Sequence, residues 1–206
     1  MASPAGRVFV AGSANIDLVA SVPRLPGPGE TVLAGAFRTL PGGKGANQAV
    51  AAAKAGSPVT FFGCVGDDPF ADKLTAVLAA AGIDLTFLER APMPTGAALI
   101  SVDPAGQNQI SVFPGANAAL SFRAEFRHAV PGDVLLCQNE SPLDVIFIYL
   151  KAARRHGVRT VLNAAPVVEL PEGLLAEVDV LVVNEVEAAQ YCLLNGGAPV
   201  RASAEE

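Results

Sequence analysis

Residues 41–48 read Pro-Gly-Gly-Lys-Gly-Ala-Asn-Gln and run directly into an alanine-rich segment that stops at Gly56. This pattern predicts a helix over 45–55 with a glycine stop. The glycines before it let the backbone approach a ligand closely, and a helix start offers free N–H groups to an oxygen-rich partner. Lys44 and Asn47 add a cationic donor and an amide. A plain structural turn explains such a helix entry equally well, so both interpretations stay open here.

Short apolar runs alternate with helical patterns on both sides of this helix. Continuous apolar strands separated by helices indicate a mostly parallel sheet with helices on both faces, a Rossmann-like α/β fold. The predicted strands are 8–11, 59–65, 84–90, 134–138, 160–163 and 180–183. The predicted helices are 45–55, 70–81, 121–129, 142–156, 171–178 and 185–194.

Two stretches, at about 16–40 and 95–113, contain only strand patterns and do not fit this layered sheet. Within the first, runs at 16–22 and 31–40 flank a cluster of proline and glycine. The second resembles a hairpin around Asp103-Pro104-Ala105-Gly106. We therefore expect a small separate sheet that acts as a lid.

Composition limits the classes of function. The chain has 206 residues, of which 51% are hydrophobic and 17% charged, so it can bury the core of a single domain. A net charge of −6 argues against binding to nucleic acid or to an anionic membrane through bulk charge. No secretory leader and no run of eighteen apolar residues occur. The three cysteines follow no pattern and indicate reduced core thiols in a cytoplasmic protein.

Further polar residues follow the predicted strands, where α/β sheets bind ligands. Asn15 and Asp17 come after the first strand and, in an extended chain, face the same side. Such a pair suits the vicinal hydroxyls of a polyol, although an Asx turn explains it equally well. Glu140 follows strand 134–138 and is either a hydroxyl acceptor or an exposed loop charge.

Asn184 and Glu187 open the last predicted helix with the spacing of a capping box. From the residues alone, capping is the favoured interpretation of this pair. A dinucleotide-binding fingerprint is excluded because no Gly-x-Gly-x-x-Gly follows the first strand.

Taken together, these segments resemble the ribokinase-like family of sugar kinases. The matching motifs, spread in order along nearly the whole chain, are GSANID (12–17), PGPGETV (26–32), GGKGANQAVAAAKAG (42–56), GDD (66–68), PGANAAL (114–120), QNESP (138–142), LNAAP (162–166) and VNEVEA (183–188). Two positions depart from the family pattern. Asn139 stands where an apolar residue is usual, and Ala165 where proline is usual.

The resemblance implies a site for a sugar and a site for ATP. The residues that it assigns to the sugar, with free ribose favoured, are Asn15, Asp17, Gly42, Gly43, Lys44, Gly45, Asn47 and Glu140. It assigns Asn184 and Glu187 to the ATP phosphates and to hydrated Mg²⁺, with Glu187 on the metal side. The segments at 16–40 and 95–113 would close over the sugar and support a homodimer.

The implied reaction transfers the ATP γ-phosphoryl group to the ribose 5-hydroxyl. The family's general base is an aspartate in a Gly-Ala-Gly-Asp motif, which this sequence lacks, together with the segments that hold adenine and K⁺. No catalytic residue is therefore expected within residues 1–206, which should form the N-terminal part of a kinase domain without turnover of its own. A capping box at Ser203 and Glu206, where a helix would begin, supports this expectation. Alternatives are a kinase for fructose, a nucleoside or a sugar phosphate, and a non-catalytic sugar-binding module.

Overall fold

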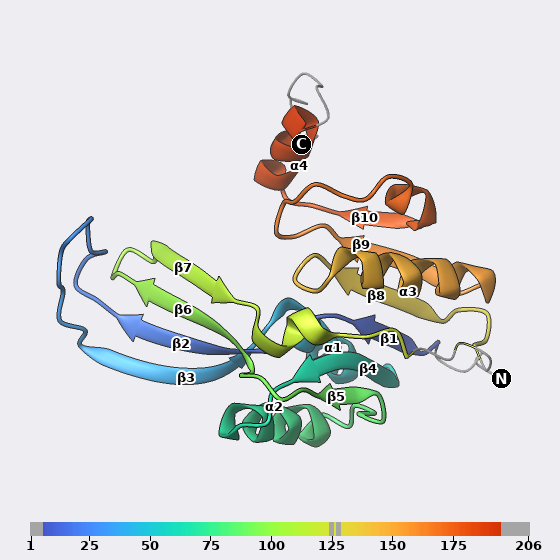
Figure 1. The fold of residues 1–206 in the computed structure, drawn as a ribbon, viewed down its shortest axis with the longest axis horizontal. Helices are drawn as coiled ribbons and strands as arrows, with labels where there is room; N and C mark the ends of the chain where they lie inside the picture. Colours follow the sequence, from blue (N-terminus) through green and yellow to red (C-terminus); the bar gives the residue numbers. More distant parts are fainter. Residues whose placement is uncertain (1–5, 124–125, 127–128, 195–206) are drawn as a thin grey trace.

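A six-stranded parallel sheet forms the body of the molecule (Figure 1). The computed structural model describes residues 6–123, 126 and 129–194, so the Ser203–Glu206 prediction lies outside the described residues. The strand order is β10-β9-β8-β1-β4-β5, and every neighbouring pair is parallel. The strands are β1 (Val8–Ala11), β4 (Val59–Val65), β5 (Leu88–Arg90), β8 (Val134–Gln138), β9 (Arg159–Asn163) and β10 (Val180–Val182). The predicted parallel sheet is thus confirmed.

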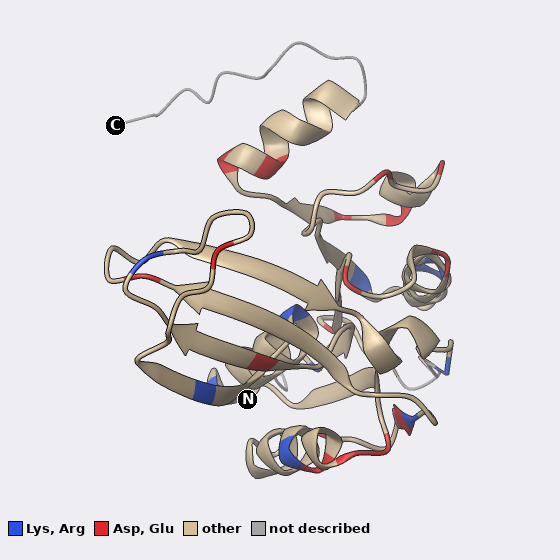
Figure 2. Ribbon diagram, turned by 60° about the vertical axis from the view of Figure 1, so that its left-hand side comes forward, with Lys and Arg blue, Asp and Glu red and all other residues tan. Residues whose placement is uncertain are grey.

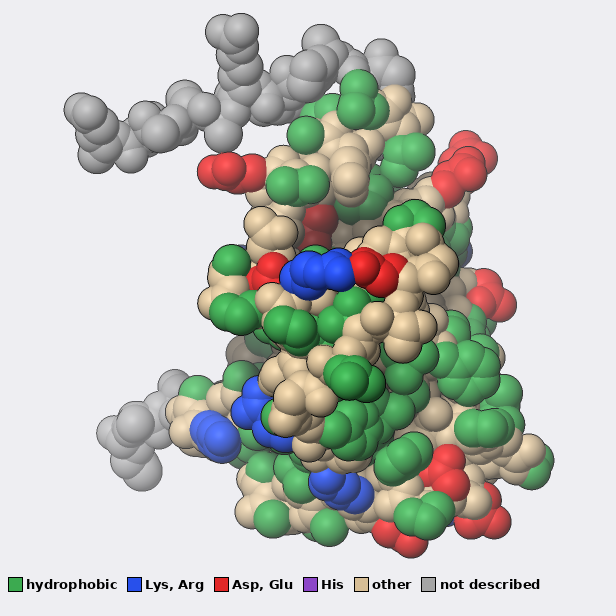
Figure 3. Space-filling view, turned by 90° about the vertical axis from the view of Figure 1, so that its left-hand side faces the viewer, with side chains coloured by type: hydrophobic (Ala, Val, Ile, Leu, Met, Phe, Trp, Pro, Cys, Tyr) green, Lys and Arg blue, Asp and Glu red, His purple; other side chains and the backbone are tan. Residues whose placement is uncertain are grey.

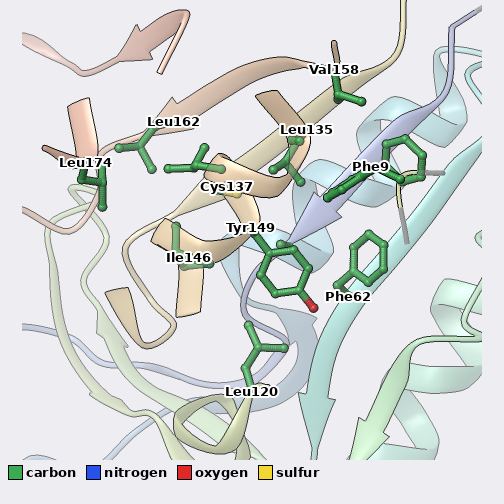
Figure 4. Packing of buried hydrophobic residues seen from close by; sticks show 14 of the residues in the cluster. Phe9, Phe62, Leu120, Leu135, Cys137, Ile146, Tyr149, Val158, Leu162 and Leu174 are labelled. Carbon is green, nitrogen blue, oxygen red and sulfur yellow. The ribbon is translucent and has the colours of Figure 1, made fainter. Parts of the chain in front are cut away.

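Helices cover both faces of this sheet. Each strand contributes side chains to both faces, because successive residues of a strand point to opposite sides. Val10 of β1 packs in a cluster with helices α1 (Lys44–Lys54) and α2 (Pro69–Ala80). Its neighbour Phe9 packs in the other cluster, with α3 (Leu143–Arg155). Figure 4 shows Phe9, Phe62 and Tyr149 in that second cluster, where the ring centroids of Phe62 and Tyr149 lie 5.3 Å apart and the two rings are tilted relative to each other. In the described part of the chain, no helix is long and apolar enough to cross a membrane.

A separate four-stranded sheet projects from the body, as Figure 1 shows on its left-hand side. Its strands, in the order β3-β2-β6-β7, are β2 (Asn15–Ser21), β3 (Ala36–Gly42), β6 (Gly96–Val102) and β7 (Asn108–Phe113). Strands β6 and β7 form the predicted antiparallel hairpin, and β2 pairs with β6 in parallel. We call these four strands the small sheet. The prediction that the two strand-only stretches form a small separate sheet is confirmed, and its role as a lid stays a prediction.

Two predicted strands are shorter in the structure than the sequence pattern predicts. Residues 31–35 are not in a strand, and β3 begins only at Ala36. The predicted strand 84–90 shrinks to β5, Leu88–Arg90. Asp84 still pairs with Thr60 of β4 in an isolated bridge. Its carboxylate accepts hydrogen bonds from the backbone N and the Oγ1 of Thr86, so that residues 85–87 form a turn instead of continuing the strand.

Two predicted helices are wrong. The described residues of 121–129 are not helical, because the Ser121 amide donates to the Glu89 carboxylate and the Arg123 amide to the Tyr149 hydroxyl. Residues 171–178 form only a short 3-10 turn, η2 (Leu174–Glu177). The last helix, α4 (Glu185–Leu194), has the predicted bounds.

Asp68 ties the small sheet to the body. Its carboxylate caps α2 by accepting from the Ala71 amide at 2.9 Å, and it also accepts from the Thr95 amide and hydroxyl at 2.7 Å each. Thr95 directly precedes β6. Burial alone would raise the pKa of Asp68, but these hydrogen bonds outweigh it and hold the pKa below its ordinary value of 3.8.

Asp68→Ala should therefore lower the free energy of unfolding by about 4 kcal/mol, because it loses a helix cap of about 1 kcal/mol and two charge-assisted hydrogen bonds of about 1.5 kcal/mol each. Because the folded-state pKa is lowered, this stabilisation is complete above the ordinary pKa and disappears as pH falls through the folded value. Denaturant unfolding at neutral and acidic pH measures both effects. Asp67→Ala is the matched control, since the Asp67 side chain is 85% exposed and, among the described residues, forms an ion pair only with Arg90, at 3.8 Å. Equal stability of the two variants would contradict this role.

Candidate functional site

A cavity of about 730 Å³ lies between the small sheet and the carboxyl end of β8, with the start of α1 in its wall. Its lining mixes polar side chains with an apolar wall from β6 and β7 that includes Ala98, Ile100, Ile110 and Val112. Six of the residues predicted to bind sugar line it together, namely Asn15, Asp17, Gly43, Lys44, Asn47 and Glu140. Residues from three distant parts of the sequence thus meet at one place.

Gly42 and Gly45, also predicted to bind sugar, shape the cavity rather than line it. A Cβ atom on Gly42 would lie 2.2 Å from the Asp17 carboxylate. A Cβ atom on Gly45 would lie 2.7 Å from the Ser13 amide nitrogen, where α1 crosses the connection between β1 and β2. Both glycines therefore allow close approaches that a side chain would prevent.

The Glu140 carboxylate is held in place from two sides. Its Oε2 accepts from the Ser13 hydroxyl at 2.6 Å and from the Lys44 amide at 3.1 Å. The Lys44 Nζ lies 3.8 Å from Oε1. Ser13 is absent from the sequence-based site, although it belongs to the GSANID motif, because its partner is 127 residues away. With one oxygen fixed by the protein, the carboxylate presents the other in a set orientation.

The first turn of α1 corrects one expectation. The sequence predicts free N–H groups there for a ligand, but the protein itself uses them. The Lys44 amide donates to Glu140, the Gly45 amide to the Ser13 hydroxyl at 3.4 Å, and the Ala46 amide to the Ser13 carbonyl at 2.8 Å. Side chains of the cavity, rather than the helix terminus, are what remain available to a ligand.

Asn15 is oriented by Asn117, a residue of the PGANAAL motif that sequence analysis does not single out. Asn117 Nδ2 donates to Asn15 Oδ1 at 2.7 Å, and Asn117 Oδ1 accepts from the Ala14 amide at 2.8 Å. Since its oxygen is used, Asn15 turns its donor group to other partners. Gly96 makes room for the pair, because a Cβ there would lie 2.2 Å from both side chains.

Asp17 shares the cavity with Glu140, and its pKa is raised by burial and, secondarily, by the negative charge of Glu140. The cavity therefore offers two carboxylate acceptors, the donors of Lys44 and Asn47, and an apolar wall. A polyol with an apolar ring face matches this set, because its hydroxyls donate to carboxylates while its C–H groups contact the wall.

Asn184 and Glu187 lie outside this cavity, at the start of α4. Figure 2 shows acidic residues at this helix end. The predicted capping box is confirmed, since the Asn184 amide donates to Glu187 Oε2 at 2.9 Å and the Glu187 amide to Asn184 Oδ1 at 2.8 Å. Among the described residues, no three His, Cys, Asp or Glu side chains gather to hold a metal ion. A role toward ATP or Mg²⁺ stays a prediction.

A chain of side-chain amides runs along the carboxyl ends of the strands toward α4, starting at Gln138, which directly precedes the cavity-lining Asn139. Gln138 donates to Gln48 on α1 at 2.5 Å, and Gln48 donates to Asn163 at 3.1 Å. Asn163 in turn donates to the Val182 carbonyl at 3.2 Å, two residues before Asn184. Local sequence patterns do not reveal this chain, because each bond joins different elements.

Residues 5–205 match the family model of the pfkB family carbohydrate kinases. Ribokinase from Haemophilus influenzae is 39% identical over 183 residues, which cover 87% of this chain and 60% of that protein. The crystal structure of ribokinase from Thermotoga maritima has a TM-score of 0.81 and 37% identity, covering 93% of this chain and 64% of that one.

Ribokinase from Arabidopsis thaliana, solved with ribose and ATP, is also similar, with a TM-score of 0.79 and 32% identity. The match covers 90% of this chain and 62% of the Arabidopsis chain. The chain thus spans about three fifths of the length of these relatives.

Proposed function

Because this chain belongs to the pfkB family of carbohydrate kinases, we propose that its cavity holds D-ribose as the acceptor sugar of an ATP-dependent ribokinase. The observation that carries the proposal is the gathering of Asn15, Asp17, Lys44, Asn47 and Glu140 around one cavity with an apolar wall. The similar ribokinase that was solved with ribose and ATP supports it. In the reaction, the sugar's 5-hydroxyl would attack the ATP γ-phosphorus in line.

The cavity favours a free sugar over the alternative substrates. Two carboxylates and one ammonium line it, so a sugar phosphate would meet net negative charge. None of the described lining residues is aromatic, so a nucleoside base would find no stacking surface. Saturation-transfer NMR on the chain with D-ribose, D-fructose, adenosine and ribose 5-phosphate tests this preference. We expect ribose to give the strongest signal, and displacement of ribose by adenosine at lower concentration would overturn it.

The nucleotide would bind at the start of α4. Glu187 fits a hydrated Mg²⁺ there, because only its Oε2 takes part in the capping box and its Oε1 has no partner among the described residues. Mg²⁺ prefers such carboxylate oxygens and retains several waters. When bound, the ion would neutralise phosphate charge during transfer. Asn184 would meet the phosphates beside it. Adenine and K⁺ are assigned to no described residue.

Residues 1–206 alone should hold ribose without phosphorylating it. Both cavity carboxylates are assigned to substrate binding, and no described residue is assigned the role of general base. An assay of ADP release with D-ribose and MgATP checks this: we expect no release above that of a boiled sample. Ribose-dependent release at a rate typical of kinases would contradict it.

The small sheet would close over the sugar and exclude water, which otherwise competes as phosphoryl acceptor. Its face away from the cavity exposes Phe37, Leu99 and Phe113 at 65%, 58% and 52%, and Figure 3 shows apolar side chains gathered on this side of the molecule. We assign this face to a second copy of the chain. The free thiols of Cys64, Cys137 and Cys192 suit a cytoplasmic location.

Leu99→Asp should convert such a dimer to a monomer, because it places a charge in the middle of the apolar face. Sedimentation equilibrium measures the mass, and calorimetry should show an unchanged ribose affinity because Leu99 points away from the cavity. Ser111→Asp places the same charge on the residue that pairs with Leu99 in the small sheet. Comparing the masses of the two variants shows whether dissociation of the dimer requires loss of the Leu99 side chain or only a charge on this face. A wild-type monomer at 100 µM, roughly where weak interfaces assemble, would contradict the assignment.

A further inference from the structure

Tyr191 attaches α4 to the rest of the molecule. None of the residues of α4 is fully buried, but the Tyr191 ring packs, partly buried, against the core cluster that contains Tyr149 and Leu162. Its hydroxyl accepts from Asn139 Nδ2 at 2.9 Å and from the Val168 amide at 3.4 Å. The helix that begins with Asn184 and Glu187 is therefore bound to a residue of the cavity wall.

The residue of the cavity wall that Tyr191 contacts is Asn139, and the side-chain amide of Asn139 can take only one orientation. It is 7% exposed, lines the cavity and directly precedes Glu140. Its Nδ2 donates to the Pro166 carbonyl at 3.0 Å as well as to Tyr191, and its backbone amide donates to the Ala165 carbonyl at 3.1 Å. A reversed side-chain amide would set oxygen against the Pro166 carbonyl oxygen, so the donor must face Tyr191.

We infer that Asn139 and Tyr191 are positioning residues that couple the sugar cavity to α4. A sugar hydroxyl on Glu140 would order residues 139–142, which fixes Asn139 and, through it, the Tyr191 hydroxyl. Because linkage is reciprocal, whatever holds α4 in place also favours the sugar-bound loop. The inference rests on the proposed function, since ribose at Glu140 is the ligand that starts the coupling.

Hydrogen–deuterium exchange of the 206-residue chain, with and without saturating D-ribose, tests the coupling. Ribose should slow amide exchange in residues 185–194 roughly fivefold, the effect of one net hydrogen bond. The slowing should disappear in Tyr191→Phe, which removes only the hydroxyl, and in Asn139→Leu, which keeps the size but removes the donor. If Asn139→Leu does not fold, Tyr191→Phe carries the test alone.

Tyr149→Phe is the matched control. The Tyr149 hydroxyl, in the only other tyrosine of the chain, is also hydrogen-bonded, accepting from the Arg123 amide and donating to the Ser121 carbonyl. A merely structural loss should affect this variant equally, but it should keep the ribose-induced slowing in α4. Persistence of the slowing in Tyr191→Phe, or its loss in Tyr149→Phe as well, would overturn the inference.

Calorimetric titration with D-ribose in parallel separates this inference from the proposed function. Ribose heat without any change of exchange in residues 185–194 would overturn the coupling and leave the proposed function intact. Absence of ribose heat from the folded chain would overturn both. Ribose heat, together with a slowing of amide exchange in residues 185–194 that requires both the Tyr191 hydroxyl and the Asn139 side-chain amide, would support both the coupling and the proposed function.

Discussion

Asp17→Asn should weaken D-ribose binding about 100-fold, because a hydrogen bond from a sugar hydroxyl to a carboxylate contributes about 2–3 kcal/mol. The substitution keeps the shape of the side chain and removes its charge. Titration calorimetry measures the change. Asp67→Asn, on an exposed carboxylate outside the cavity lining, should bind ribose like the wild type. Equal affinity of Asp17→Asn and the wild type would show that Asp17 does not contact the sugar.

The same variant should be slightly more stable than the wild type at neutral pH. The raised pKa of Asp17 means that the folded state binds its proton more tightly than the unfolded state does. Stability therefore falls as pH rises from the ordinary value of 3.8 through the raised folded pKa, and the cost is fully present at neutral pH. Asparagine removes this cost. Ribose affinity shows the opposite trend, since it should decrease as pH falls through the raised pKa in the wild type only.

Gly43→Ala should abolish ribose binding and lower the free energy of unfolding by about 3 kcal/mol. Gly43 has a φ of +89° at the start of α1. A Cβ atom there would lie 2.7 Å from the Asn15 amide nitrogen and 2.9 Å from the Ser13 carbonyl oxygen, and both neighbours are backbone. The chain must therefore move where Asn15, Ser13 and Lys44 form the cavity, which displaces the Glu140 contacts too.

Gly56→Ala separates backbone strain from this close approach. Gly56 has nearly the same φ, +91°, with no atom within 4 Å of a Cβ. It should lose only about 1 kcal/mol, the cost of a left-handed conformation, and it should bind ribose normally. Denaturant unfolding and calorimetry on both variants make the comparison. If both variants lose the same stability and both bind ribose, the close approach at Gly43 is not needed for ribose binding.

The sequence predicts the main sheet well because its strands are decided locally. Strands 59–65 and 134–138 have the predicted bounds, since each is a largely apolar run bordered by turn-forming residues, Pro58 and Gly66 for the first and Asp133 and Asn139 for the second. Residues 121–129 could not be predicted in the same way. Their backbone amides bind Glu89 and Tyr149, which lie 32 and 26 residues away in sequence. Such contacts leave no mark on local periodicity.

The residues of the candidate site also fall into two groups, those that the local sequence reveals and those that depend on distant partners. Asn15, Asp17 and Glu140 could be found because polar residues at strand ends stand out in an apolar chain. Ser13 and Asn117 could not, because they act through Glu140 and Ala14, which are 127 and 103 residues distant. The partners of the α1 amides could not be predicted for the same reason, since only the fold brings Ser13 and Glu140 to the helix start.

Calorimetric titration of the 206-residue chain with D-ribose shows whether the cavity is a ribose site. We expect saturable heat with one site per chain, a roughly 100-fold weaker isotherm for Asp17→Asn, and no such loss for Asp67→Asn. A chain that unfolds cooperatively, and so is folded, but gives no heat with ribose at millimolar concentration would contradict it.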